Sequence, residues 1–310
     1  MGYIDHERSM SDLLETPGRQ LKQRPELNPD ISAIKLTLLY RQLANIVSSL
    51  STLSASRIGS LRQSGKSAWE VAYRPLSMSM NQVVRLGTLP RSELPTTTYD
   101  KAPLYFEALA ELHLSHLKHQ RNNAIDSADD CRHERVAGVI DWEFTYTAPA
   151  EFTYAPPWWL LLETPEYWSK GLDDWCTKYE KWLPMFLQAI VECEEKACQN
   201  QNGRLQESQR LSSQMRRSWE SGGFGIKCAA KNNFAFDATY WNKIDQRFFG
   251  FNKSDDNICD IWKKRRDLLE PEETEIMEKY VNLKLQKNET RVLSWDPDEY
   301  TIGYMAKMKT

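Results

Sequence analysis

The sequence lacks the signals of a secreted, membrane-bound or nucleic-acid-binding protein. No stretch approaches the ~18 consecutive apolar residues that a membrane-spanning helix requires. The first residues, MGYIDHERSMSDLL, contain acids and no apolar run, so they do not resemble a secretory signal. The 40 basic and 43 acidic residues leave a net charge of −3, which gives no general attraction to nucleic acid or to an anionic membrane. We therefore expect a cytoplasmic protein with no nucleic-acid or membrane partner.

Several short chemical motifs are also missing. The six cysteines are scattered and include no C-x-x-C pair, so zinc-finger spacing is absent and reduced thiols are expected. The glycine-rich stretch at residues 221–225, SGGFG, fits neither a GK[ST] phosphate loop nor a GxGxxG frame. A turn that ends a helix, with glycine in the left-handed region, explains this stretch better. No GxSxG nucleophile motif occurs.

The chain does have a pattern typical of a packed helical protein. It is 310 residues long, and its 11 % aromatic content, with 11 tryptophans, is too high for a disordered chain. After Pro29 and Asp30, apolar residues recur every three or four positions, which predicts a helix with one buried face. The residues of this face are Leu36, Leu39, Leu43, Ile46, Val47 and Leu50.

Other segments predict a few strands among further helices. Residues 57–77 are expected to be extended, with a hairpin turn at Ser64-Gly65-Lys66. A helix is expected from Pro103 to about Arg121, and its inward positions would be Phe106, Leu109, Leu112 and Leu117. In the second half, only Pro184 interrupts a long helical pattern. We therefore predict a mainly α fold with a few short strands (α+β), organised as one compact unit.

Two groups of charged or titratable residues have simple structural explanations. His113, His116 and His119 are three apart, but on a helix the third lies about 240° from the first, off the shared face. Surface or partly buried histidines are therefore favoured over a metal site. The basic run from Lys263 to Arg266 is followed by four glutamates, which favours a solvated face of mixed charge over a nucleic-acid patch.

The apolar segment PPWWLLLETPEYW, residues 156–168, must be buried somewhere. Trp158 and Trp159 are therefore expected to pack in the core. The alternative is that this tryptophan pair forms a docking surface for a protein partner.

The stretch GVIDWEFTYTAPAEF, residues 138–152, places Asp141 at the end of an apolar strand. In kinase-like folds, an aspartate in this position offers its carboxylate to Mg²⁺, which prefers oxygen ligands and bridges the nucleotide phosphates. The pattern alone equally allows Asp141 to cap the turn that follows. Glu143, two residues later, is a candidate for an additional metal contact by adjacency alone.

Together with PPWWLLLETPEYW, this stretch resembles fungal members of the aminoglycoside phosphotransferase-like family, a branch of the protein-kinase-like fold. The resemblance extends over nearly the whole chain. Further stretches that carry it are YIDHERSMSD, RIGSL, WEVAYRPLSMSMNQVVRLG, YFEALAELHLSHLKHQRN and FAFDATYWNKIDQRFFG.

The resemblance implies one helical, kinase-like lobe over residues 1–310, with 1–10 as a remnant of the hinge and about 290–310 as a tail. Asp141 corresponds to the family's metal-binding aspartate, and Tyr3 and Ile4 correspond to the hinge that meets the adenine. ATP and Mg²⁺ are the implied cofactors. The implied activity is phosphorylation of a hydroxyl group on a small molecule, whose identity the sequence does not indicate.

The sequence also departs from the family pattern. The glycine-rich phosphate loop and the lysine strand would lie upstream of Met1. Between Gln120 and Asp141, no H-x-D-x-x-x-x-N catalytic loop occurs, because His133-Glu134-Arg135 lacks the aspartate. No asparagine stands five places after the acids of this segment, which are Asp126, Asp129 and Asp130. A degenerate relative would explain both gaps, and so would a gene model with a mis-set start and a skipped exon.

These departures predict a chain that does not catalyse phosphoryl transfer. The reaction gains nearly all its rate from positioning and charge neutralisation, and each missing element contributes about 10² or more. The alternative from a different class is a non-catalytic interaction protein of the pseudokinase type. Mg²⁺-dependent affinity for ATP would distinguish a phosphotransferase from it.

Overall fold

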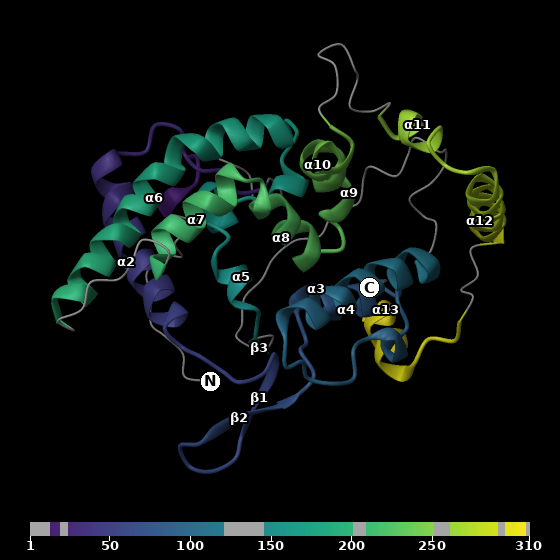
Figure 1. Cartoon of the computed structure of the whole chain (residues 1–310), viewed down its shortest axis with the longest axis horizontal. Coiled ribbons are helices and arrows are strands. Elements are labelled where there is room, and N and C mark those ends of the chain that lie inside the picture. The colour runs from purple at the N-terminus through teal and green to yellow at the C-terminus, as the bar shows by residue number, and fades with distance from the viewer. Residues whose placement is uncertain are drawn as a thin grey trace. The chain divides into compact units, whose positions relative to one another are not determined.

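The computed structural model describes residues 13–18, 24–120, 146–200, 209–250, 261–290 and 295–307. Within these ranges the protein is mainly helical, with one small antiparallel sheet, as the sequence predicts (Figure 1). The chain forms two compact units, each built from two stretches of sequence. Unit 1 comprises Met1–Ser54 and Ala150–Phe224, and unit 2 comprises Ala55–Pro149 and Gly225–Thr310. The assignment of residues 1–310 to a single kinase-like lobe stays a prediction.

Unit 1 consists of helices. Its elements are α2 (Ala33–Ser51), α5 (Ala150–Thr153), two 3₁₀ turns named η3 (Trp158–Leu161) and η4 (Pro165–Tyr167), α6 (Leu172–Asn200) and α7 (Leu211–Glu220). The long helix α6 packs against α2 on one side and against α7 (Figure 1). Pro184 lies inside α6, and the helix continues on both sides of it. The interruption predicted at Pro184 therefore does not end the helix.

The buried face of α2 is rotated from the predicted one. Leu36, Tyr40 and Ala44 are buried, and Leu39, Leu43 and Val47 pack beside them, as part of a 3.6-residue stripe. Ile46 and Leu50 were predicted to be inward, but their side chains are 53 % and 46 % exposed. The prediction was wrong for these two residues because Tyr40 and Ala44, rather than Ile46 and Leu50, complete the stripe that faces α6.

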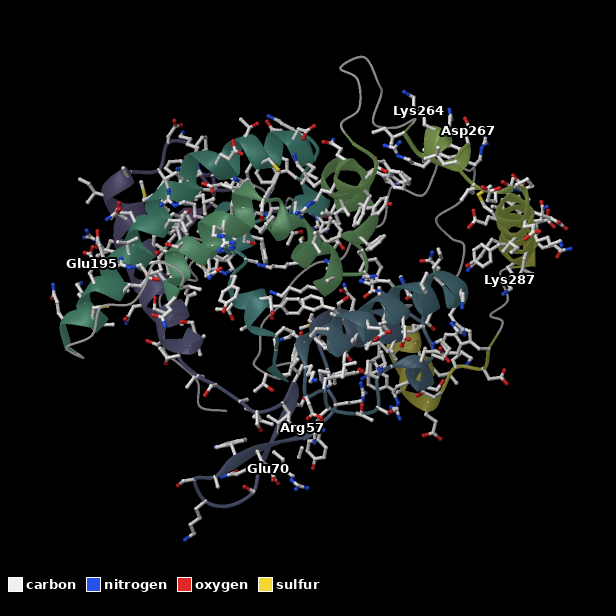
Figure 2. All side chains as sticks on the ribbon, in the orientation of Figure 1. Arg57, Glu70, Glu195, Lys264, Asp267 and Lys287 are labelled. Carbon is white, nitrogen blue, oxygen red and sulfur yellow. The ribbon has the colours of Figure 1, made fainter. Side chains whose placement is uncertain are left out.

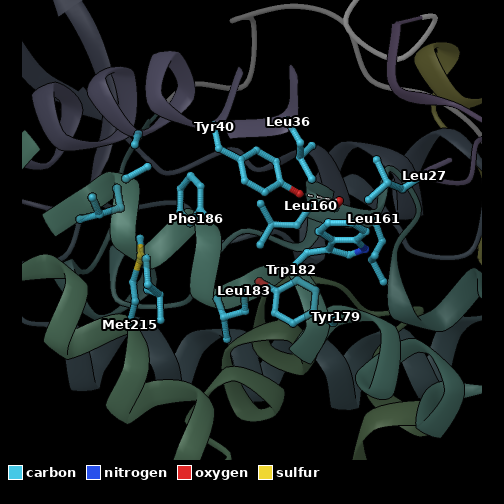
Figure 3. Close-up of a cluster of buried hydrophobic side chains, with 14 of the residues drawn as sticks. Leu27, Leu36, Tyr40, Leu160, Leu161, Tyr179, Trp182, Leu183, Phe186 and Met215 are labelled. Carbon is cyan, nitrogen blue, oxygen red and sulfur yellow. Dashed lines mark hydrogen bonds between the residues drawn. The ribbon is translucent and has the colours of Figure 1, made fainter. Parts of the chain in front are cut away.

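The core of unit 1 is aromatic and depends on few polar contacts. Tyr40 is buried between Phe186, whose ring meets it edge to face at 5.8 Å, and the η3 turn, where its hydroxyl donates to the carbonyl oxygen of Leu160 (3.1 Å; Figure 3). On α6, Trp175 and Tyr179 stack at 4.5 Å between ring centroids. The indole N–H of Trp175 donates to the carbonyl oxygen of Glu163 at 2.9 Å. The Tyr40 hydroxyl and the Trp175 indole N–H therefore each have a hydrogen-bond acceptor, which offsets the cost of removing them from water.

Unit 2 contains the sheet and the remaining helices. Its first stretch holds β1 (Gly59–Gln63), β2 (Trp69–Tyr73), α3 (Met78–Arg85), the 3₁₀ turn η1 (Arg91–Glu93), α4 (Ala102–His119) and β3 (Tyr146–Thr147). Its second stretch holds most of α8 (Gly223–Lys231), α9 (Phe236–Thr239), the π-helical turn η6 (Tyr240–Ile244), α10 (Asp245–Phe249), α11 (Ile261–Arg266), α12 (Pro271–Thr290) and α13 (Glu299–Lys307).

The hairpin predicted over residues 57–77 is confirmed. Strands β1 and β2 pair antiparallel, and the backbone N–H of Ser64 donates to the carbonyl oxygen of Ala68 at 2.9 Å across the turn. The strand order is β2-β1-β3, so β1 is central and β3 joins it from a later part of the chain.

Helix α4 confirms the predicted span and two of its four predicted inward positions, Leu109 and Leu112, while Phe106 is only partly buried. It buries Tyr105, Leu109, Leu112 and His116, which are spaced four, three and four residues apart. Leu117 was predicted to be inward, but it is 48 % exposed. Each helical residue turns by about 100°, so a helix that buries His116 places Leu117 beyond the edge of the buried stripe.

The glycine-rich stretch is a helix-ending turn only in its first half. Gly222 has a φ of 73° and follows the end of α7, as predicted. Gly223 and Gly225 instead belong to the next helix, α8. At Gly225 a methyl group would lie 3.2 Å from Thr239 Cγ2, so glycine there allows η6 and its flanking residues to approach closely.

Two further observations concern membrane spans and cysteine. Among the described residues, no helix combines the length and apolarity needed to cross a bilayer. Four cysteines lie in the described ranges, and all are free thiols, namely Cys176, Cys193, Cys198 and Cys228.

Candidate functional site

The residues predicted to bind cofactor and metal lie outside the described residues. These are Tyr3 and Ile4 at the expected hinge, Asp141 at the expected metal position, and Glu143 beside it. Their roles stay predictions. The first described element after Asp141 along the chain is β3. The residues that hold β3 in place are therefore the described residues nearest to Asp141 in the sequence.

Strand β3 is fixed to the central strand by both backbone and side-chain bonds. Tyr146 pairs with Ser60, and Thr147 pairs with Gly59. The Thr147 hydroxyl donates to the carbonyl oxygen of Arg57 at 2.7 Å and accepts the N–H of Gly59 at 3.2 Å. A two-residue strand makes few ladder bonds, so this hydroxyl supplies much of its attachment.

Three tyrosines connect β3 to α4. The ring centroids of Tyr99 and Tyr105 are 5.3 Å apart, and those of Tyr105 and Tyr146 are 6.0 Å apart. The Tyr105 hydroxyl donates to the Tyr146 hydroxyl at 3.2 Å. Burial raises the pKa of both phenols above the usual value, so they stay protonated at neutral pH. These groups can position a chain segment or donate a hydrogen bond, but they are not bases.

The histidines of α4 occupy different surroundings and do not converge. The ring of His116 is 7 % exposed, its Nε2 lies 3.0 Å from Thr88 Oγ1, and the edge of Phe234 meets it. Burial lowers its pKa to about 4, with smaller contributions from the charges of His113 and Lys284. His116 is therefore a neutral core histidine, more deeply buried than the surface or partly buried position that the sequence favours.

His113 and His119 complete this picture. The His113 ring lies 5.1 Å from Phe236 between centroids, and burial lowers its pKa. His119 Nδ1 lies 2.9 Å from the carbonyl oxygen of Ser115. Across the described ranges, no three histidine, cysteine, aspartate or glutamate side chains group as metal ligands would.

A lysine that sequence reasoning did not single out holds the C-terminal end of α4. Lys284 of α12 is 5 % exposed, and its ammonium donates to the carbonyl oxygens of Lys118 and Gln120 at 3.1 and 3.0 Å. These carbonyls are among those left unbonded at a helix end, where a positive charge is favoured. Burial lowers the pKa of Lys284 to about 8, and the charge of Lys287 contributes.

The basic run on α11 is only partly solvated. Lys263, Lys264 and Arg266 are exposed on a mixed-charge surface that includes Asp267, as predicted (Figure 2). Arg265 turns inward instead and forms a bidentate ion pair with the fully buried Asp245, at 2.9 and 2.8 Å. Sequence spacing could not reveal this pair, because its partners are 20 residues apart and belong to different helices.

The two neighbouring tryptophans, Trp158 and Trp159, differ in burial. Trp159 packs edge to face against Phe186 at 5.5 Å, which confirms core packing for this residue. The Trp158 side chain is 41 % exposed, so core packing was the wrong prediction for it. A 3₁₀ turn points successive side chains in directions about 120° apart, so two neighbouring tryptophans in η3 cannot share one face.

Comparison with known proteins adds no relative. No family model, no curated protein and no solved structure matches this chain.

Proposed function

We propose that this chain is a non-catalytic member of the aminoglycoside phosphotransferase-like family, in which Asp141 keeps the family's metal-binding position. One observation carries the proposal most. The GVIDWEF stretch ends two positions before Tyr146, the first residue of β3, which pairs with a central antiparallel strand and is joined to α4 through Tyr105. In kinase-like folds, a carboxylate that comes shortly before such a strand along the chain serves as a metal ligand.

The composition of the segment between Gln120 and Asp141 supports the non-catalytic part of the proposal. It contains no aspartate followed five positions later by asparagine, so both a base for the acceptor hydroxyl and a second metal ligand are missing. Phosphoryl transfer depends on positioning and charge neutralisation, and one carboxylate supplies little of either. ATP and Mg²⁺ are the family's cofactors, and Tyr3 and Ile4 would meet the adenine. A cytoplasmic location belongs to the same proposal.

The catalytic part is tested by measuring phosphate release and phosphate transfer from ATP in the presence of Mg²⁺. We expect no turnover above buffer for the unmodified chain. Turnover that Asp141→Asn abolishes would show that the chain is an active phosphotransferase. A matched control is Asp100→Asn, because Asp100 is an exposed aspartate that pairs with Arg57 on the surface.

The metal-binding part is tested separately with Mn²⁺, a paramagnetic ion that takes the same oxygen ligands as Mg²⁺. We expect added Mn²⁺ to broaden the backbone amide NMR signals of Tyr146 and Thr147. This broadening should be lost in Asp141→Asn and retained in Asp100→Asn. Equal broadening in all three proteins would remove the basis for assigning Asp141 to a metal.

A second candidate function is a non-catalytic docking protein that has no relation to nucleotides. The exposed indole of Trp158 favours it, because large aromatic side chains at a surface are enriched in protein interfaces. If Mn²⁺ fails to broaden the β3 signals and Mg·ATP does not bind, this candidate replaces the first.

A further inference from the structure

Three arginines of unit 2 gather where α3 and η1 meet α13. Arg85, at the end of α3, lies over the ring of Tyr304, with its guanidinium carbon 4.1 Å from the centroid. Arg91, in η1, lies over Tyr300 at 5.9 Å. The two tyrosines are four residues apart on α13, so their rings are neighbours one helical turn apart. The helices α3 and α13 also pack together (Figure 1).

Arg74 belongs to the same group. It lies between β2 and the residue that caps α3, and burial, followed by the charge of Arg91, lowers its pKa. A partly buried guanidinium close to a second one is costly unless an anion balances the two charges. The group defined by Arg74, Arg85 and Arg91 is called the arginine cluster below.

Two donors of the arginine cluster, and a third that is close to Asp298 in the sequence, have no acceptor among the described residues. Arg74 Nη1, Arg85 Nε and the indole Nε1 of Trp295 are each buried and make no hydrogen bond. Trp295 comes three residues before Asp298, which pairs with Arg91. Unsatisfied buried donors are rare, and every one named here is an N–H, so the missing partner is an acceptor.

The ion pairs of the arginine cluster also indicate that an anionic acceptor is missing. In the described ranges, the ion pair found for this cluster is that between Arg91 Nε and Asp298 Oδ2, at 3.3 Å. Asp298 is also occupied by the backbone N–H of Thr301, which donates to its Oδ1 at 2.9 Å. Among the described residues, three guanidiniums with one carboxylate leave two positive charges, and a phosphate group carries about −1.5 to −2 at pH 7. Its several oxygens can accept from more than one guanidinium fork.

We propose that the arginine cluster, with Trp295, is a binding site for a phosphate group, carried either by inorganic phosphate or by a phosphate ester. Arg74 and Arg85 donate to its oxygens, and Asp298 competes with it for Arg91. The site lies wholly in unit 2, and it does not depend on the function proposed for Asp141.

The experiment titrates the full chain with inorganic phosphate, while chloride keeps the ionic strength constant so that general screening does not change. Binding is followed by calorimetry and by the NMR signal of the Trp295 indole N–H. We expect saturable binding with a dissociation constant on the order of 1 mM or tighter, together with a shift of that indole signal. Absence of saturation below about 20 mM would overturn the proposal.

Substitutions then locate the site. Arg74→Gln removes the charge and should weaken phosphate binding about tenfold. Arg57→Gln is the matched control, because Arg57 is an exposed arginine of the same unit that pairs with Asp100, and it should leave binding unchanged. Equal weakening by the two substitutions would mean a diffuse charge effect and would overturn the proposal.

Asp298→Asn keeps the proposal testable even if Arg74→Gln folds poorly. Asparagine can still accept the N–H of Thr301, but it no longer competes for Arg91, so we expect phosphate to bind about fivefold more tightly. A merely destabilised protein would not gain affinity, and unchanged or weaker binding in this variant would contradict the assigned site. A parallel titration with phenyl phosphate identifies the ligand's source, because a clear preference for it assigns an ester and the reverse assigns free phosphate.

Discussion

Gly59 is the residue on which the small sheet depends most directly. Its α-carbon faces neighbours on three sides, at a place where β1 meets both β2 and β3. A methyl group there would collide with the backbone carbonyl oxygen of Tyr73 and lie 2.8 Å from Thr98 Cγ2 and from Val71 Cγ1. The sheet therefore requires glycine at this position because of space and not because of backbone conformation.

Gly59→Ala should destabilise the protein by about 2–3 kcal/mol, since the strands must separate to accommodate the methyl group. Urea denaturation measures this change. Gly65→Ala is the control, because the nearest atom to its new methyl group would be Ala68 Cβ at 3.8 Å, an ordinary contact. The control should stay within about 0.5 kcal/mol of the unmodified protein. Equal stability of the two variants would show that β1 is not packed as described.

His116 makes the stability depend on pH in a defined window. Its pKa is about 4 in the folded protein and near 6.5 in an unfolded chain. Between these values the unfolded state binds a proton that the folded state does not, so the free energy of unfolding rises with pH. This contribution, roughly 3 kcal/mol, is complete above about pH 6.5 and is lost as the pH falls towards 4.

Urea denaturation at pH 4.5 and pH 7 tests this expectation on the unmodified protein and on His116→Gln. The variant should lose less stability on acidification than the unmodified protein, because glutamine does not titrate. The neighbouring titratable groups, His113 and Lys284, are present in both proteins and cancel in the comparison. Identical pH dependence would mean that His116 is not buried as a neutral ring.

At the scale of elements, the start of α7 is held by a carboxylate from α6. Glu194 is 6 % exposed, and its Oε1 accepts the backbone N–H of Ser212 at 2.9 Å. Its Oε2 accepts the Ser212 hydroxyl at 2.7 Å. The first N–H groups of a helix have no partner within that helix, and a negative charge near them is favoured. Glu194 thus acts as a capping group supplied by a neighbouring helix.

Glu194→Ala should lower the free energy of unfolding by about 2–3 kcal/mol, because the N–H and the hydroxyl of Ser212 are left buried without an acceptor. Glu195→Ala is the matched control, since Glu195 is the next residue of α6 and its side chain is exposed (Figure 2). It should change the stability by less than about 0.5 kcal/mol. The two midpoints in urea give the comparison directly, and equal losses would remove the capping role.

At the scale of the whole molecule, the two units suggest how substitutions combine. Tyr40→Phe in unit 1 removes the hydrogen bond to Leu160, and Tyr105→Phe in unit 2 removes the one to Tyr146. Each should cost about 1 kcal/mol. The double variant should show the sum within about 0.5 kcal/mol, because the hydrogen bond of Tyr40 lies within unit 1 and that of Tyr105 to Tyr146 lies within unit 2.

A pair within one unit provides the contrasting case. Tyr105→Phe and Tyr146→Phe delete the same hydrogen bond, so their combination should cost less than the sum of the single effects. Urea denaturation of the three single and two double variants, beside the unmodified protein, completes both cycles. Strong coupling between Tyr40 and Tyr105 would contradict the division of the contacts into two units.

Several features were accessible from the sequence because they rest on local rules. The hairpin follows from a glycine-containing turn between β-forming residues, and the turn at Gly222 follows from the freedom of glycine at positive φ. The helix α4 follows from apolar spacing, although that spacing placed Leu117 inward. The metal and hinge predictions fall on Asp141, Tyr3 and Ile4, outside the described residues, and so stay predictions.

The sequence by itself determined the helical class, the position of most helices and the fact that the three histidines of α4 do not share one helix face. Periodicity and turn chemistry act over a few residues, which is why they can be followed along the chain. The tertiary structure alone decided which face of α2 is buried, that Arg265 meets Asp245, and that Arg85 and Arg91 lie over tyrosine rings of α13. These features join residues far apart along the chain, and only the packing of the helices brings such residues into contact.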